Sequence, residues 1–207
     1  MTIELQIRPA QARDAEICAA LIHPASPELY DYIFDDGAHR ALEFMQFEFD
    51  QGGGGLGHRL HTAVELDGRV VGVGGLQWHE DLMRISVEST QNIVHFYGIA
   101  RAREVLRRAG HGKSVIAKPE PQRPHTTNLG VDASVRGRGI CSALLAQELL
   151  RARARGCKEL SLDVAVNNPR AKALYERLGY RVMREQRFEG DPGAKVLDSY
   201  LMILAIT

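Results

Sequence analysis

Hydrophobic and polar positions change their spacing along the chain, and each spacing predicts one kind of element. Apolar and polar residues alternate from Ile3 to Arg8, which predicts a half-buried strand that ends at Pro9. After Asp14, a suitable helix cap, apolar residues recur at helical spacing from Ile17 to Ile22. The region Glu28–Phe49 shows the same helical spacing and predicts a further pair of helices.

The middle of the chain predicts a hairpin and then becomes less regular. Two β-rich runs, His61–Leu66 and Val70–Leu76, are separated by Asp67-Gly68, a dipeptide that favours a tight turn between antiparallel strands. The segment from Arg84 to Tyr97 fits neither spacing clearly. Residues Gly98–Ala109 have helical spacing and are followed by Gly110, so we expect a helix there.

The last third of the chain alternates between strand and helix patterns. The expected elements are a strand at Thr127–Val131, a helix at Ile140–Arg155, a strand at Leu160–Val166, a helix from Pro169 to Leu178, and closing strands at Tyr180–Gln186 and Val196–Ile206. A strand, helix, strand, helix order followed by two strands predicts an α/β sheet with a parallel crossover.

Composition narrows the class of protein. A chain of 207 residues without an internal repeat predicts a single domain spanning 1–207. Lys+Arg and Asp+Glu are equal at 26, and this balance argues against a general nucleic-acid binder. The basic run Arg151, Arg153 and Arg155 is interpreted as a solvated last helical turn.

Cysteine use and hydropathy predict the compartment. The three cysteines Cys18, Cys141 and Cys157 show no CxxC spacing, which is typical of a reducing environment. The chain has neither a signal-peptide pattern nor an apolar run approaching the ~18 residues of a membrane span. We therefore expect a cytoplasmic protein without membrane attachment.

The segment Arg136–Ser142 carries the clearest chemical signal. It follows a predicted strand and opens a predicted helix, whose first N–H groups are unpaired and attract anions. Gly137 and Gly139 leave room for a phosphate, and Arg136 and Arg138 add positive charge. The loop has neither the Gly-Lys-Ser/Thr ending of a P-loop nor the third glycine of a dinucleotide fingerprint. The alternatives are a phosphate-bearing ligand that is not an ordinary nucleotide cofactor, or a glycine-relaxed turn with surface arginines.

Three motifs together distinguish these alternatives: Leu129-Gly130-Val131, Arg136-x-x-Gly139, and Asn168-x-x-Ala171-x-x-Leu174-Tyr175-x-x-x-Gly179-Tyr180. In this order and spacing they resemble the GNAT superfamily of N-acetyltransferases. The resemblance covers Thr126 to Tyr180, and the predicted strand, helix and hairpin before it occur in the family's order. Segments near 24–57 and 79–124 match no motif and are expected to be divergent or inserted.

The resemblance implies a fold, an activity and a co-substrate. The fold would be a GNAT-like, mostly antiparallel central sheet with one parallel, splayed strand pair, flanked by helices. The activity would be acetyl transfer from acetyl-CoA to an amine-bearing acceptor, a small molecule or a protein amine, without a metal. A homodimer is also a habit of the family.

The resemblance also implies the roles of individual residues. Leu129, Gly130 and Val131 would contact the pantetheine arm and the thioester through their backbone. The pyrophosphate would lie on the loop residues Arg136, Gly137, Arg138, Gly139, Ile140, Cys141 and Ser142, where Cys141 replaces the usual Gly or Ala. Asn168 would meet the pantetheine, and Tyr175 would lie near the sulfur.

Direct acetyl transfer also needs proton donors and acceptors. Tyr175 can donate a hydrogen bond to the departing sulfur, although its place on the apolar stripe of a helix also suits a core aromatic. An amine must lose a proton before it attacks, and Glu80 and His125 are the candidates for the base. Either residue could equally be a solvated polar side chain.

Three other interpretations remain as alternatives. Cys141 at a helix N-terminus could be a nucleophile, although its small size explains its presence in the loop better. His58-x-x-His61 could bind a metal, but the glycine run Gly52–Gly55 before it, which we expect to be a mobile loop, does not support one helical face. Finally, the domain could be a non-catalytic acyl-CoA-binding or interaction module.

Overall fold

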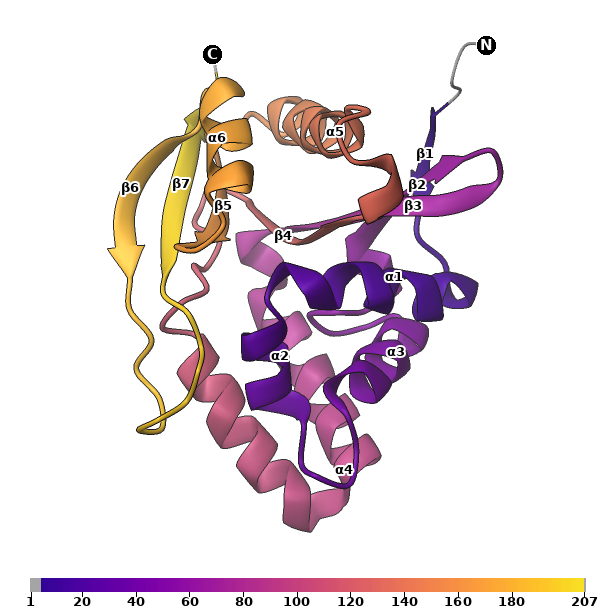
Figure 1. Ribbon diagram of the computed structural model, residues 1–207, viewed down its shortest axis with the longest axis vertical. Coiled ribbons are helices and arrows are strands. Elements are labelled where there is room, and N and C mark those ends of the chain that lie inside the picture. The colour runs from indigo at the N-terminus through magenta and orange to yellow at the C-terminus, as the bar shows by residue number, and fades with distance from the viewer. Residues whose placement is uncertain (1–4, 207) are drawn as a thin grey trace.

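The computed structural model describes residues 5–206, which form a seven-stranded sheet with helices on both faces (Figure 1). Ile3, in the first predicted strand, lies outside the described residues. The strands are β1 (Leu5–Pro9), β2 (His61–Leu66), β3 (Arg69–Gln77), β4 (His125–Val131), β5 (Glu159–Ala165), β6 (Arg181–Gln186) and β7 (Ser199–Ala205). The helices are α1 (Ala15–Ile22), α2 (Pro27–Phe34), α3 (Ala41–Gln51), α4 (Leu82–Gly112), α5 (Ile140–Ala154) and α6 (Pro169–Arg177).

The strand order is β1-β2-β3-β4-β5-β7-β6, and β4 with β5 is the parallel pair among otherwise antiparallel neighbours. This arrangement confirms the predicted mostly antiparallel sheet with one parallel pair. The β2–β3 hairpin turns at Asp67 and Gly68, whose φ angles of 50° and 77° are positive, as the dipeptide predicts. Strand β4 begins at His125, two residues before the predicted start.

Two layers of helices bury the two faces of the sheet. Helices α5 and α6 cover one face, where Leu145, Leu160 and Tyr175 belong to one apolar cluster. Helix α1 covers the other face, and α2, α3 and α4 build a further layer over it, with Phe44 and Phe49 fully buried (Figure 1). The site described below lies where these layers meet the parallel strand pair.

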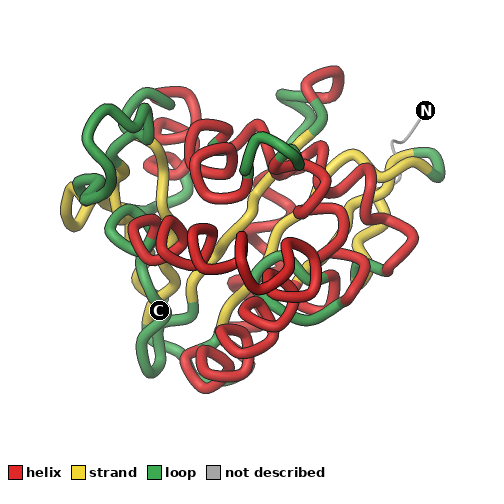
Figure 2. The backbone as a smooth tube through the Cα atoms, turned by 90° about the horizontal axis from the view of Figure 1, so that it is seen from below, coloured by secondary structure: helices red, strands yellow, loops and turns green. Residues whose placement is uncertain are grey.

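Helix α4 fills much of the segment 79–124 for which no motif was found. It packs against α2 and α3, and Figure 2 shows helices covering the strands when the molecule is seen from below. The helical run is broken at Gly98, whose φ of 70° and ψ of 159° are not helical. The first half of α4 contains Arg84–Tyr97, whose sequence fits neither spacing clearly but which is helical. The second half contains the predicted helix Gly98–Ala109 and extends to Gly112.

The glycine run Gly52–Gly55 is part of the packed interior, so the expected mobile loop is wrong. The Gly54 amide donates to Glu88 Oε2 at 3.0 Å, and the Gly55 amide donates to Ser89 Oγ at 2.9 Å. A Cβ atom on Gly54 would lie 2.3 Å from Glu48 Oε1. Gly54 is therefore needed because the backbone passes directly over the buried Glu48 side chain.

Candidate functional site

The parallel strands β4 and β5 separate almost as soon as they meet. Among the described residues, they pair only at His125 with Ser161 and at Thr126 with Leu162. Beyond these pairs, the edge of residues 127–131 that faces β5 has no strand partner. The register of β4 against β3 shifts at the same place, between Val73 and Gly75. A bulge therefore turns β4 away from β5 and opens a gap between them.

Asn128 lies at this bulge with a φ of 55°, a conformation that asparagine tolerates better than most residues. Its Oδ1 accepts a hydrogen bond from the Tyr30 hydroxyl at 2.9 Å, and its Nδ2 donates to the Gly55 carbonyl at 2.8 Å and to His61 Nε2 at 3.0 Å. Burial lowers the pKa of His61 to about 4, so this histidine is a neutral acceptor. Sequence reasoning did not single out Asn128, because an asparagine inside a predicted strand gives only a weak indication of a bulge.

The loop before α5 has the geometry of an anion site. Gly137 and Gly139 have φ angles of 83° and 81°, and a Cβ atom on either would meet nothing within 4 Å. Gly139 is the N-cap of α5, and no side chain caps the helix there. The first N–H groups of the helix are thus available to a phosphate, and Arg136 and Arg138 are exposed beside them. These features fit the pyrophosphate of a coenzyme A molecule.

The other residues of the Leu129-Gly130-Val131 motif and of the loop Arg136–Ser142 line the cavity or pack against neighbouring elements. Leu129 and Val131 line the cavity. A Cβ atom on Gly130 would lie 2.1 Å from the Leu21 carbonyl oxygen, so packing against α1 requires this glycine. Ile140 and Ser142 also line the cavity at the start of α5, and Ile140 is buried whereas Ser142 is half-buried.

Cys141 lines the cavity as well, but its thiol is poorly suited to act as a nucleophile. Burial raises its pKa to about 12, so the reactive thiolate is scarce at neutral pH. The side chain packs against the apolar cluster under α5 and α6. Its environment agrees with the interpretation of Cys141 as a small loop residue.

Helix α6 places Asn168 and Tyr175 on the far side of the gap. Asn168 Oδ1 accepts a hydrogen bond from the Ala171 amide at 3.1 Å, so the asparagine is the predicted N-cap. Tyr175 is 7% exposed and lines the cavity, and burial raises the pKa of its phenol. Within residues 5–206 its hydroxyl has no hydrogen-bond partner, and it remains a protonated donor at neutral pH.

A single cavity of about 1210 Å³ joins these parts. Three arginines line it: Arg136 beside the glycine loop, Arg170 at the start of α6 and Arg177 at the end of α6. Away from the glycine loop, the cavity extends from the bulge into the helical layer formed by α2, α3 and α4. Its walls there are mostly apolar and consist of Leu29, Ile33, Phe34, Phe44, Leu56, Ile93, Val115 and Ile116. Three residues with polar groups, Tyr30, Glu48 and Ser89, lie among them.

The two candidates for the base are placed differently. Glu80 lies outside the cavity lining, with its side chain 65% exposed and paired with Arg155 at 2.8 Å. The structure thus separates Glu80 from the other predicted site residues, because β3 runs past the gap and ends at Gln77, opposite His125, where β4 and β5 are still paired. His125 does line the cavity, but its Nε2 lies 3.2 Å from Asp163 Oδ2 and its Nδ1 lies 3.0 Å from Ser161 Oγ. Both ring nitrogens are already engaged.

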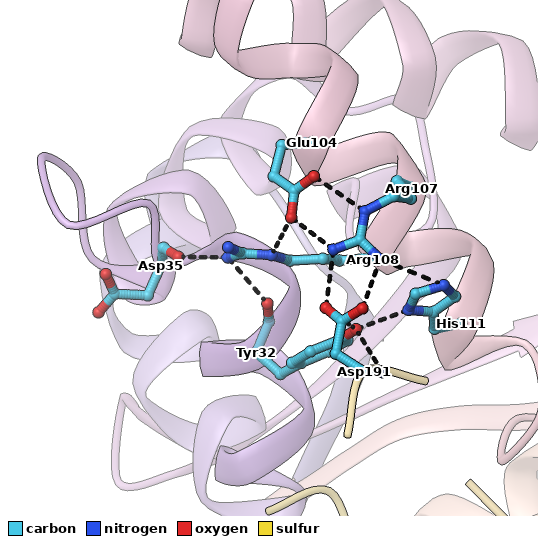
Figure 3. A network of polar contacts seen from close by, with 7 residues as sticks. All are labelled: Tyr32, Asp35, Glu104, Arg107, Arg108, His111 and Asp191. Carbon is cyan, nitrogen blue, oxygen red and sulfur yellow. Dashed lines mark hydrogen bonds and ion pairs between the residues drawn. The ribbon is translucent and has the colours of Figure 1, made fainter. Parts of the chain in front are cut away.

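The segment between β6 and β7 closes the rim of the cavity, where it contributes Leu197. Its turn residue Asp191 is held by Arg107 through contacts of 2.6 and 2.7 Å and accepts a hydrogen bond from the Tyr32 hydroxyl at 2.9 Å. Figure 3 shows how this carboxylate joins α2 and α4, with His111 also bonded to Tyr32. The network ties the C-terminal hairpin to the helical layer.

Within residues 5–206, no group of three or more His, Cys, Asp or Glu side chains is placed to hold a metal ion. His58 instead lies 2.9 Å from the Phe49 carbonyl, and His61 is bonded within the site. Within the same range, every helix is too short or too polar to cross a bilayer.

Comparison with known proteins agrees with this geometry. Similar solved structures include an N-acetyltransferase from Staphylococcus aureus, with 16% identity, a TM-score of 0.70, and coverage of 96% of this chain and 100% of that one. A ribosomal-protein-alanine N-acetyltransferase from Brucella melitensis has 17% identity, a TM-score of 0.58, and coverage of 97% and 99%. A structure from Salmonella typhimurium that holds its cofactor acetyl-CoA has 16% identity, a TM-score of 0.55, and coverage of 99% and 95%.

These likenesses concern the fold. The model of the acetyltransferase (GNAT) family matches residues 19–180, a span that includes the bulge, the glycine loop and α6. The chain therefore belongs to the acetyltransferase (GNAT) family.

Proposed function

We propose that this protein transfers the acetyl group of acetyl-CoA directly to a primary amine. The observation that carries the proposal is the junction of two features: the glycine loop at the start of α5 and the gap that opens between β4 and β5. The first suits a pyrophosphate, and the second suits an extended pantetheine arm with free backbone groups beside it. Their adjacency fits one ligand with both parts.

The chain's own residues divide the work of binding. The loop from Arg136 to Ser142 would hold the phosphates through backbone amides and the two arginines. The unpaired edge of β4 from Leu129 to Val131 would hold the pantetheine, with Asn168 and α6 on its other side. Acetyl-CoA supplies an activated acyl group on a good leaving group.

Two groups near the gap suit the chemistry of acyl transfer. Backbone N–H groups beyond the bulge would stabilise negative charge on the carbonyl oxygen, and Asn128 holds the bulge in place through its three hydrogen bonds. The Tyr175 hydroxyl would donate a proton or a hydrogen bond to the departing sulfur, since burial keeps it protonated. The cavity residues thus provide a donor without requiring a metal ligand.

The alternative is a non-catalytic acyl-CoA-binding module. An assay of thiol release from acetyl-CoA, run over a library of amines with mass spectrometry of the products, separates the two. We expect amine-dependent thiol release together with an acetylated amine product. Tight acetyl-CoA binding without release for any amine would support the binding module instead.

A further inference from the structure

The apolar end of the cavity contains one buried carboxylate that belongs to no ion pair. Glu48 is 2% exposed on α3 and lines the cavity. Its Oε2 accepts the Leu56 amide at 3.2 Å, and its Oε1 accepts Asn92 Nδ2 at 3.3 Å. No Lys, Arg or His side chain of residues 5–206 pairs with it. A buried carboxylate without a counter-charge is costly, and a cation that enters the cavity would offset that cost.

Glu48 is also connected to the site of acetyl transfer. The Leu56 amide bonds to Glu48, and the carbonyl of the preceding residue, Gly55, accepts the hydrogen bond from Asn128 at the bulge. A two-residue segment thus lies between the carboxylate and the bulge. Gly54 leaves room for the Glu48 carboxylate, since a Cβ atom at this position would collide with Oε1.

The charges of the cavity separate its two ends. The arginines at the glycine-loop end suit an anion, whereas Glu48 provides negative charge at the other end. Asp163, the acidic residue near the middle, already accepts hydrogen bonds from the Ala117 amide at 2.7 Å and from Gln186 Nε2 at 2.8 Å, and it faces His125. Asp132, the third carboxylate of the lining, pairs with Arg69 at 2.8 Å. Glu48 is therefore the carboxylate of this lining for which the described residues provide no cation.

The walls around Glu48 define what the rest of the ligand is like. Leu29, Ile33, Phe34 and Ile93 line this end of the cavity from α2 and α4, and Phe44 lines it from α3. Apolar surface of this kind favours an aliphatic or aromatic body and disfavours a second charge. Helix α4 packs against α2 and α3 at this end, and the β6–β7 segment is tied to α4 through Asp191.

We propose that the acceptor is a small primary amine with an apolar body, whose ammonium group pairs with Glu48 before transfer. The proposal rests on the acetyltransferase function proposed above. Glu48 takes one proton from the ammonium and passes it to solvent. The nitrogen then forms the C–N bond as the C–S bond breaks, and its second proton ends on the thiol.

The environment of Glu48 suits this proton transfer. Burial raises its pKa to about 7, and hydrogen bonds from Ser89 and Asn92 oppose that rise. On α4, the charge of Glu88 raises the pKa of Glu48 further, and the charge of Glu48 contributes to the raised pKa of Tyr97. His58, in the turn before β2, and His61, the first residue of β2, pack on the adjacent Phe49. A base must be ionised to act, so kcat/KM is expected to rise with pH through about 7.

The test compares acceptors and variants of the whole protein. Hexylamine and phenethylamine represent apolar amines, and spermidine and a peptide with a free α-amine represent the other classes. We expect the apolar amines to have the highest kcat/KM. Glu48→Gln should lower kcat/KM for phenethylamine about 100-fold and remove its rise near pH 7. Glu43→Gln, an exposed residue on the same helix, is the matched control and should behave as wild type.

A binding measurement separates recognition from turnover. With coenzyme A present, calorimetry should show that Glu48→Gln weakens binding of phenethylamine and leaves binding of its neutral analogue phenethyl alcohol unchanged. Equal affinity of both proteins for acetyl-CoA would show that the variant is folded and that the co-substrate site is intact. The proposal is overturned if spermidine or the peptide is the best acceptor, or if Glu48→Gln keeps the wild-type rate and pH profile. Absence of thiol release with every amine would instead contradict the proposed function itself.

Discussion

Glycines at the site serve two different purposes at the scale of single residues. Gly137 and Gly139 have positive φ and open space where a side chain would be, so they make room for a ligand. Gly130 has no such space, because α1 packs directly on it. The glycines of the two neighbouring motifs therefore meet different requirements, packing at Gly130 and ligand binding at Gly137 and Gly139.

Replacement of Gly130 tests the packing role. In Gly130→Ala, the new Cβ would overlap backbone atoms of α1, which cannot move without displacing the helix. We expect a loss of about 3 kcal/mol in the free energy of unfolding, measured by urea denaturation. Gly137→Ala, whose Cβ meets no atom, should cost less than Gly130→Ala. Equal losses in the two variants would contradict this account of Gly130.

Tyr175 is the residue on which the proposed chemistry of the leaving group depends. Tyr175→Phe removes the hydroxyl and keeps the packed ring, so kcat should fall at least tenfold while the KM for acetyl-CoA stays the same. Tyr180→Phe is the control, because its buried hydroxyl has no hydrogen-bond partner among residues 5–206 and lies outside the cavity lining. An unchanged kcat in Tyr175→Phe would assign the tyrosine to the core alone.

At the scale of elements, local signals predicted the second half of the fold well. Asn168 and Pro169 fix the start of α6, and Asp67-Gly68 fixes the β2–β3 turn, because each acts through its own backbone geometry. Helix α4 was harder to predict, since Gly98 interrupts its spacing and Met83, Val87 and Ile99 are exposed apolar residues.

The candidate site was predictable only in part for a related reason. Its phosphate end is a contiguous loop, Arg136–Ser142, with a local sequence pattern. Its acceptor end depends on Glu48, Gly55 and Asn128, which come together through tertiary contacts between distant segments. No spacing along the chain indicates that Glu48 and Asn128 lie on either side of the same short segment.

The interface between α5 and the sheet contains a second buried carboxyl group, Glu148. Burial raises its pKa to about 8, and the Thr126 hydroxyl donates a hydrogen bond to it. Because the folded protein holds this proton to a higher pH than the unfolded chain does, the contribution of Glu148 to stability is present at acid pH and is lost as pH rises from about 4.5 to 8.

Glu148→Gln tests this pH dependence. Between pH 5 and 8 the free energy of unfolding of the wild type should fall relative to that of the variant, in which this carboxyl group is absent. Glu48 also has a raised pKa and is present in both proteins, so the difference between them isolates Glu148. Urea denaturation at several pH values measures it. Parallel pH profiles for the two proteins would show that Glu148 does not titrate as described.

At the scale of the whole molecule, the cavity joins parts of the chain that lie far apart in sequence. The sheet supplies the gap, α5 and α6 supply the phosphate end, and the helical layer supplies the apolar end. The β6–β7 segment closes the rim through Asp191, and Arg107 holds the pKa of that carboxyl well below its usual range. Acceptor binding should therefore depend on the Asp191–Arg107 contact, although neither residue takes part in acetyl transfer.

Asp191→Ala tests that dependence. Loss of the bonds to Arg107 and Tyr32 should increase hydrogen exchange in residues 187–198 and raise the KM for the acceptor several-fold, while acetyl-CoA affinity stays the same. Arg103→Ala, exposed on the same helix as Arg107, is the control. Unchanged exchange in the segment would show that its other contacts, including Phe188 against Tyr32, are sufficient to hold it.

The central claim is that the glycine loop of α5 binds acetyl-CoA, and calorimetric titration tests it most directly. We would titrate wild type and an Arg136→Glu, Gly139→Asp variant with acetyl-CoA and with coenzyme A. We expect micromolar binding of both ligands to the wild type and its loss in the variant, whose new carboxylates repel the pyrophosphate. Absence of binding to the wild type, or equal binding to the variant, would contradict the claim.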